Sequence, residues 1–119
     1  MASLSMAMPV ESGKSGQLRS FVNDVLGARR AEFEASEKRI GITREGWYFQ
    51  PSPMGDLAIV WVEAADPMTS LGSFIQSQEL FDSWFKAQVL DITGVDLNQA
   101  PERGPAVLMD WSAPARVGS

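Results

Sequence analysis

The chain has 119 residues, of which 45% are hydrophobic and 21% charged, and its formal net charge is -5. This length fits one domain, and the composition is that of an ordinary globular protein. The acidic balance argues against a nucleic-acid-binding protein, which usually shows a basic face, and against adhesion to anionic membranes. No apolar run approaches the roughly 20 residues that a membrane-spanning helix needs.

Histidine and cysteine are both absent from the sequence. Without cysteine there is no disulfide, thiol nucleophile or zinc–thiolate site, and we expect a cytoplasmic protein. Without histidine the chain lacks the usual general base near neutral pH, the Ser-His-Asp triad and most sites for haem or transition metals. We therefore expect no metal and no cofactor, and any catalysis has to rest on carboxylates, Arg, Lys, Tyr or a reactive substrate.

The first part of the chain predicts a strand and a long helix. Residues 2–10 alternate between larger apolar and smaller side chains, which is the period of a strand. After the turn ESGKSG, residues 15–40 carry apolar side chains at helical spacing, although Gly27 interrupts the pattern. A helix of about 25 residues reaches roughly 37 Å and would overshoot a sheet, because an ordinary strand spans only about 23 Å. If the chain breaks at Gly27, no part of the helix extends beyond the sheet.

The rest of the chain predicts a hairpin, two helices and a final strand. The hairpin strands cover residues 42–50 and 56–64 and are joined by the turn PSPMGD. Asp66 and Pro67 are typical of a helix start, so we expect a helix over 67–76 and another over 78–93 that ends at Gly94. The segment AVLMDW, residues 106–111, predicts the last strand, and we expect residues 113–119 to be a flexible tail.

This order, βαββαβ, predicts a single α+β domain of ferredoxin-like fold over residues 1–112. The fold has a four-stranded antiparallel sheet with helices on one face, and the other face is bare in a monomer. Here the strands carry apolar side chains on both faces, so the bare face needs a cover. A second copy of the chain supplies one, and we expect a homodimer through the open sheet face.

Several segments resemble the dimeric α/β-barrel superfamily. They are MPVESGK before the long helix, the hairpin GWYFQPSPMGDLAIVWVEA, the DP that opens the next helix, and FDSWFKAQVLDITGVDL after it. The superfamily includes antibiotic-biosynthesis monooxygenases, EthD-like proteins, muconolactone isomerase and stress-responsive barrel proteins. The resemblance covers residues 2–112 and is one of topology and pattern. It is strongest to small bacterial members without an assigned activity.

The resemblance implies a homodimer in which two sheets face each other and close a barrel, with a pocket between each sheet and its helices. It does not imply an activity, because one fold hosts many functions. Branches that bind haem through histidine, and histidine-dependent isomerases, do not fit a chain without histidine. Cofactor-independent monooxygenation, in which the substrate itself activates oxygen, stays open, as does an isomerase-like activity.

The aromatic hairpin offers the candidate ligand site. Arg44 and Tyr48 share one face of its first strand, and Trp61 and Glu63 share one face of its second. A flat aromatic pocket with a few polar contacts fits a small apolar or aromatic molecule. Alternatively, the aromatic side chains belong to the core or the dimer interface, and the protein is a non-catalytic structural or interaction module without a ligand.

No catalytic residue is assigned by the sequence. Glu63 and Asp110 interrupt apolar strands, and a buried carboxylate could act as a base because burial raises its pKa. Otherwise each lies at a strand end, in water or paired with an arginine. The charged residues of the long helix predict a solvated face rather than a site; these are Arg29, Arg30, Glu32, Glu34, Glu37, Lys38 and Arg39.

Overall fold

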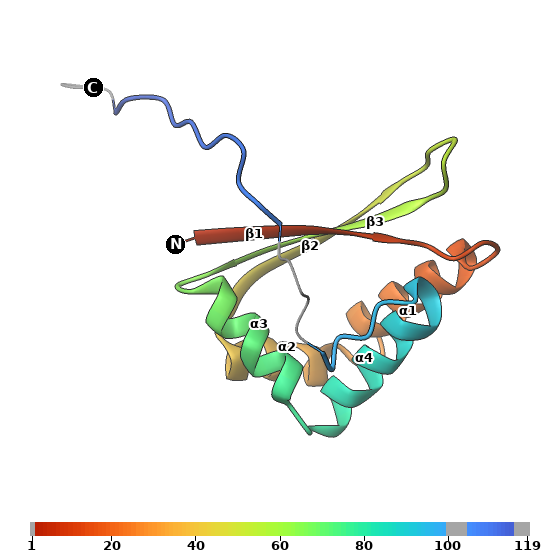
Figure 1. Cartoon of the computed structure of the whole chain (residues 1–119). Coiled ribbons are helices and arrows are strands. Elements are labelled where there is room, and N and C mark those ends of the chain that lie inside the picture. The colour runs from red at the N-terminus through yellow and green to blue at the C-terminus, as the bar shows by residue number, and fades with distance from the viewer. Residues whose placement is uncertain (1, 100–104, 116–119) are drawn as a thin grey trace.

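The helices all lie on one face of an antiparallel sheet (Figure 1). The computed structural model describes residues 2–99 and 105–115. In chain order these residues form β1 (Ala2–Pro9), α1 (Ser15–Leu26), α2 (Arg30–Ile40), β2 (Ile42–Gln50), β3 (Leu57–Ala64), α3 (Pro67–Gln76) and α4 (Leu80–Thr93). The strand order is β1-β3-β2, and both neighbouring pairs are antiparallel. In this described part of the chain, no helix is long and apolar enough to cross a membrane.

The hairpin and the two helices after it confirm the sequence prediction closely. β2 and β3 begin and end within a residue of the predicted strands. The Asp66 carboxylate accepts hydrogen bonds from the Thr69 amide at 3.3 Å and the Thr69 hydroxyl at 2.7 Å, which caps the start of α3. Gly94 ends α4 in the left-handed conformation, with φ of 77°. The predicted α+β class, with helices on one face, is confirmed.

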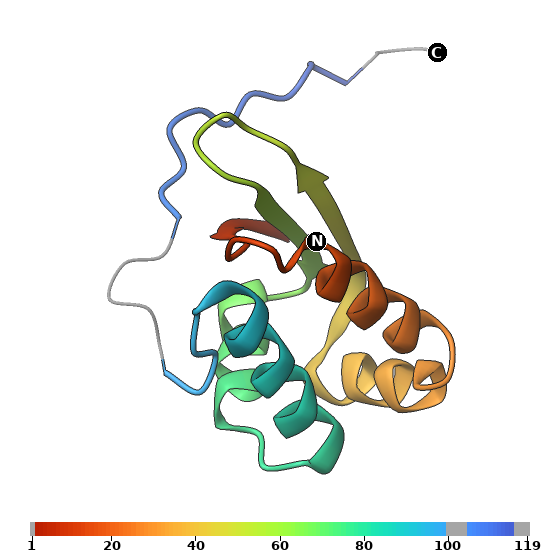
Figure 2. The same cartoon turned by 90° about the vertical axis from the view of Figure 1, so that its right-hand side faces the viewer.

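The helix predicted over residues 15–40 breaks at Gly27 into α1 and α2. A Cβ atom at Gly27 would lie 2.8 Å from the carbonyl oxygen of Asn23, so only glycine fits there without a shift. The Arg29 amide donates to the Asp24 carbonyl at 2.8 Å as the chain turns. α2 therefore folds back beside α1 instead of projecting past the sheet (Figure 2).

The fourth strand, predicted over residues 106–111, is not found in the structure. Residues 105–115 form no strand, and every one of them is exposed. Figures 1 and 2 show this segment leaving the body of the protein on the side of the sheet opposite the helices. Among the described residues the sheet therefore has three strands, and the predicted fourth strand does not join it.

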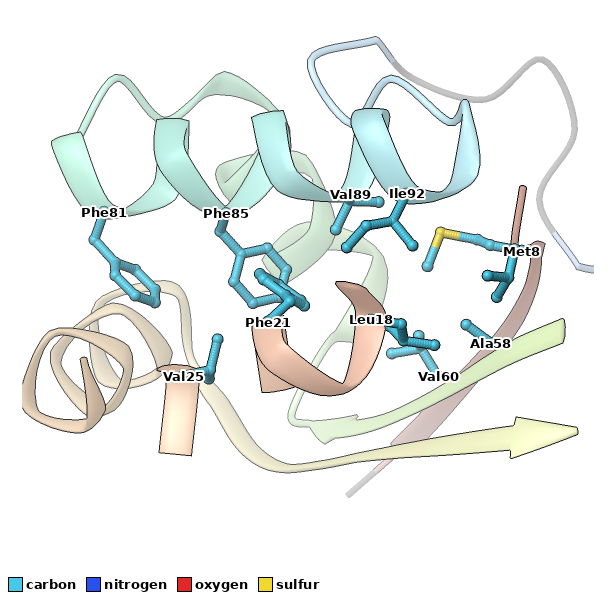
Figure 3. Close-up of a cluster of buried hydrophobic side chains, with 11 residues drawn as sticks. Met8, Leu18, Phe21, Val25, Ala58, Val60, Phe81, Phe85, Val89 and Ile92 are labelled. Atoms are coloured by element: carbon cyan, nitrogen blue, oxygen red, sulfur yellow. The ribbon is translucent and has the colours of Figure 1, made fainter. Parts of the chain in front are cut away.

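The core lies between the sheet and the helices (Figure 3). At its centre the rings of Phe21 and Phe85 meet edge to face, with centroids 4.9 Å apart. Trp47 of β2 contacts Phe85 in the same manner at 6.0 Å. Each such pair contributes about 0.5–1.5 kcal/mol beyond the burial of its surface. These rings fix α1 and α4 over β2, which leaves the space beside Trp47 to be lined by α2 and α3.

A buried carboxylate links α2 and α4, two of the helices beside this space. Asp82, at the start of α4, is fully buried. It accepts hydrogen bonds from the hydroxyls of Ser36 and Ser77 and from the Arg39 guanidinium, the last at 2.8 Å. Burial by itself would raise the pKa of Asp82, but these hydrogen bonds and the charge of Arg39 outweigh it and lower that pKa. The ionised carboxylate thus ties α2 to α4.

We expect Asp82→Ala to lower the free energy of unfolding by about 3–5 kcal/mol, because it leaves Arg39 and two hydroxyls without their buried acceptor. Urea denaturation measures this loss. Glu32→Ala is the matched control, since Glu32 makes only an exposed ion pair with Arg29 at 3.6 Å and should cost less than about 1 kcal/mol. Equal losses in the two variants would contradict the role of Asp82.

Candidate functional site

The four candidate ligand contacts suggested by the sequence all lie on the open face of the sheet. Arg44 pairs in register with Glu63, and its guanidinium carbon lies 5.1 Å from the centre of the Trp61 ring. Tyr48 lies on the same face and is 64% exposed. The structure therefore brings Arg44, Trp61 and Glu63 together, but on the face that points away from the helices. Their role as ligand contacts stays a prediction, and Asp110 lies in the exposed segment after the helices.

A cavity of about 70 Å³ lies between the sheet and the helices, and we call it the inner cavity. Its walls are mostly apolar and come from all three strands and from α2, α3 and α4. Two carboxyl groups interrupt these walls, Glu37 from α2 and Glu45 from β2. The sheet–helix gap is thus not completely filled, and its polar groups are not those that the sequence suggested.

The periodicity of each element places these two glutamates inside. Along α2, Glu37 follows Phe33 by four residues and precedes Ile40 by three, so it lies on the apolar stripe of that helix. Along β2, Glu45 alternates with Trp47 and pairs in register with Val62 of β3, on the face covered by the helices. The expectation of a solvated face is therefore wrong for Glu37, which is half-buried.

The two carboxyl groups share a hydrogen bond, and their pKa values are raised. Burial is the main cause for Glu37, followed by the charge of Glu45 and the hydrogen bond to it, and together they raise the pKa of Glu37 to about 9. Burial also raises the pKa of Glu45, while hydrogen bonds from Trp47 and Glu37 oppose that effect. The Trp47 indole nitrogen donates to Glu45 Oε2 at 2.7 Å. The pair therefore keeps a proton at neutral pH, and the two carboxyl groups titrate together.

A solvent-open groove reaches the same pair from the outside. The groove runs between α2 and β2, has a volume of about 480 Å³, and we call it the α2–β2 groove. Glu37 and Glu45 line both the groove and the inner cavity. The charged residues Glu34, Lys38 and Arg44 also border the groove. The carboxyl pair thus lies at the boundary between an apolar interior and a groove large enough for a small molecule.

Sequence reasoning missed this pair, although the sequence holds a signal for it. Glu45 is the one charged residue in the alternating set Glu45, Trp47 and Phe49, which the hairpin pattern already places on a single face. Glu37 lies at helical spacing from Phe33 and Ile40. Taken alone, each glutamate is expected to be a solvent-exposed charge. The candidate site forms only because α2 and β2 bring the two side chains together.

Comparisons with known proteins bear on the fold. No protein-family model matches the sequence, and no curated protein matches it. A solved structure that does match is tetracenomycin F2 cyclase from Streptomyces glaucescens, a type-II polyketide cyclase. The match covers 96% of this chain and 100% of that one, with a TM-score of 0.60 and 15% sequence identity. At this identity the likeness shows a shared α+β fold.

We expect Glu37→Gln to stabilise the protein at alkaline pH. Below about pH 4.5 Glu37 is protonated in both the folded and the unfolded chain, so it adds no pH dependence. As the pH rises towards 9, the unfolded chain releases the proton and the folded chain keeps it, so the free energy of unfolding falls. Glutamine removes this fall and still donates a hydrogen bond to Glu45. At pH 8 the variant should be more stable than the wild type by about 1–3 kcal/mol, after allowance for partial exposure.

Thermal or urea unfolding at pH 4.5 and pH 8 measures this difference directly. Glu32→Gln, on the exposed side of the same helix, is the control and should follow the wild type at both values. A Glu37→Gln variant that gains no stability between the two pH values would show that Glu37 ionises normally in the folded protein.

Proposed function

We propose that the protein is a small-molecule enzyme that moves protons on an apolar or aromatic carbonyl compound. The substrate lies in the α2–β2 groove with its carbonyl group at Glu37 and Glu45. One arrangement supports this most strongly: two glutamate carboxyl groups, whose pKa values are raised chiefly by burial, line both a groove and an apolar cavity. Two such groups with different proton affinities are what acid–base catalysis requires.

The chemistry divides between the two side chains. Glu45, the acceptor of the pair, takes a proton from the carbon next to the carbonyl group, and Glu37 gives its proton to the carbonyl oxygen, so that an enol forms. Return of the Glu45 proton to a different carbon isomerises the substrate, while the enol oxygen gives its proton back to Glu37 and the carbonyl group re-forms. Alternatively, attack of the enol carbon on a second carbonyl carbon forms a ring. The enol oxygen then returns its proton to Glu37, and the oxygen of the attacked carbonyl takes up the proton held by Glu45. The apolar walls strengthen both hydrogen bonds by excluding water.

The structural neighbour supports this class of activity. It is a type-II polyketide cyclase, and ring closure on a carbonyl-rich substrate is the second of the two outcomes above. A cofactor-independent monooxygenase would begin with the same removal of a proton. We place isomerase- or cyclase-like chemistry first because both carboxyl groups then have a role.

We also propose that the protein acts as a homodimer through the open sheet face. Trp61 and Tyr48 lie on that face, where Trp61 is flanked in register by the small residues Ser5 and Gly46. These small side chains leave space beside the large indole ring, and side chains of a second copy can fill it. Burying such a face would stabilise the dimer by the hydrophobic effect.

The rival is a non-catalytic dimeric module without a ligand. One observation favours it: the inner cavity, at about 70 Å³, is far smaller than the roughly 300–1,000 Å³ of ordinary ligand pockets. On this view the carboxyl pair has no catalytic role, and the fold tolerates the loss of stability that the pair causes. The two functions differ in whether the pair can act on a molecule placed in the groove.

Hydrogen–deuterium exchange of 2-tetralone tests the proposal, because this bicyclic ketone has removable protons next to its carbonyl group. We expect the wild-type protein to accelerate the exchange, as followed by NMR. Glu45→Gln should lower the protein-catalysed rate by about 100-fold or more, the usual scale of a lost general base. The exposed-face variant Glu32→Gln should exchange protons as fast as the wild type.

A wild-type rate equal to that of Glu45→Gln would contradict the proposed chemistry and favour the non-catalytic module. Titration of 2-tetralone into both proteins separates binding from chemistry. Glutamine has nearly the shape of glutamate, so the dissociation constant should change little when the rate falls.

A further inference from the structure

Two further hollows continue from the α2–β2 groove along β2. The first has a volume of about 140 Å³, and we call it the middle hollow; α1, α2, α4 and β2 line it. It shares Phe33 and Glu45 with the groove. The second has a volume of about 320 Å³, lies between α1 and β2, and we call it the outer hollow. It shares Val22 and Trp47 with the middle hollow, so one elongated molecule can extend from the carboxyl pair along the strand.

The middle hollow suits an apolar or aromatic part of such a molecule. Phe21, Trp47 and Phe85 contribute aromatic rings to its walls, and Glu45 is the one charged residue among the described residues that line it. Leu26, the last residue of α1, borders the hollow and is 53% exposed although it is large and apolar. A flat ring placed here would pack against the aromatic side chains and cover Leu26.

The outer hollow differs from the middle hollow because a cation borders it. Arg19 of α1 lies there, with its guanidinium carbon 5.3 Å from the centre of the Phe49 ring. This cation–π contact holds the guanidinium in place and leaves its N–H groups able to donate hydrogen bonds. No ion pair among the described residues includes Arg19, whereas Arg30 and Arg39 each have a carboxylate partner at 2.8 Å. Arg19 is therefore available to an anionic group of a ligand.

The spacing along β2 sets the length of a ligand that reaches both ends. From Glu45 to Phe49 the strand advances by about 13 Å. We propose that the substrate is an elongated aryl ketone whose carboxylate group is bound by Arg19 in the outer hollow. This site rests on the proposed function, because the ketone group then lies at Glu37 and Glu45. The aromatic body of the substrate lies in the middle hollow against Trp47.

Charge fixes the direction in which the substrate lies. An anionic group beside the carboxyl pair would meet a like charge, which is repulsive. Lys38 and Arg44 border the groove at that end, but Glu34 borders it as well. Arg19 is the one charged residue among the described residues that line the outer hollow. The carboxylate is therefore more stable at Arg19, where paired hydrogen bonds from the guanidinium select it over a neutral group.

A matched pair of ketones tests the role of Arg19. In 4'-acetylbiphenyl-4-carboxylate a rigid pair of rings separates the acetyl group from the carboxylate, and 4-acetylbiphenyl is the same molecule without the carboxylate. In calorimetric titrations at low salt, we expect the wild type to bind the carboxylate about 10-fold more tightly than the neutral ketone, the scale of a hydrogen bond to a charged group. Added salt should weaken this preference, because Arg19 is exposed.

Arg19→Met keeps an apolar side chain over Phe49 and removes the charge. The preference for the carboxylate should disappear in this variant, while its affinity for the neutral ketone stays that of the wild type. Arg29→Met is the matched control, since Arg29 also lies over an aromatic ring, 4.0 Å from the centre of Trp84, but borders neither the groove nor the two hollows. It should keep the preference.

Three results would overturn the carboxylate site: no binding of either ketone, equal binding of both by the wild type, or a preference that persists in Arg19→Met. Hydrogen–deuterium exchange of the acetyl group, followed by NMR in the same samples, keeps this test apart from that of the proposed function. Exchange of both ketones without a preference would leave the chemistry standing and overturn the site. A preference that depends on Arg19, without any exchange, would support the site and contradict the chemistry.

Discussion

The hydrogen bond between Glu37 and Glu45 forms inside a layer of apolar side chains, where a charged carboxylate is poorly solvated. Two neighbouring negative charges would also repel each other, so the pair keeps a proton rather than ionising completely. The packing of the core around Trp47 fixes the position of Glu45. Trp47 packs against Phe85 and donates to Glu45, so the same indole ring anchors β2 and orients the carboxyl group.

The other buried charges of the protein show how unusual this pair is. Asp82 is surrounded by hydrogen-bond donors. Lys86 is almost fully buried, and its ammonium group donates to the carbonyl oxygens of Phe74, Ile75 and Ser77 at the end of α3. Both charges are matched by their surroundings and hold helices together. The Glu37–Glu45 pair instead brings like groups together and lowers stability at neutral pH, which is the pattern of a site rather than of a structural link.

Much of the fold could be predicted from the sequence because single elements carry strong local signals. The alternation in β2 and β3, the cap at Asp66 and the stop at Gly94 each have a local physical cause. The break at Gly27 was visible as an alternative, and a close approach of backbone atoms decides it. The fourth strand could not be settled in this way, because pairing at a sheet edge depends on contacts with distant residues and not on a local signal.

The candidate site was less predictable, since it depends on contacts between distant elements. Arg44, Tyr48, Trp61 and Glu63 were correctly grouped by strand face, but the alternation does not say which face the helices cover. That choice is fixed by the packing of Trp47 and Phe85. Glu37 lies in a helix so rich in charge that its apolar stripe is easily overlooked.

The account depends on a proton retained by the carboxyl pair. Carbon-13 NMR of the glutamate side-chain carboxyl groups, assigned with the Glu37→Gln and Glu45→Gln variants, follows each group through a pH titration. We predict that Glu37 titrates far above the ordinary range, near pH 9, and that Glu45 also titrates above that range. If both groups instead titrate between about pH 4 and 5, as free glutamates do, the pair keeps no proton at neutral pH and the proposed site is wrong.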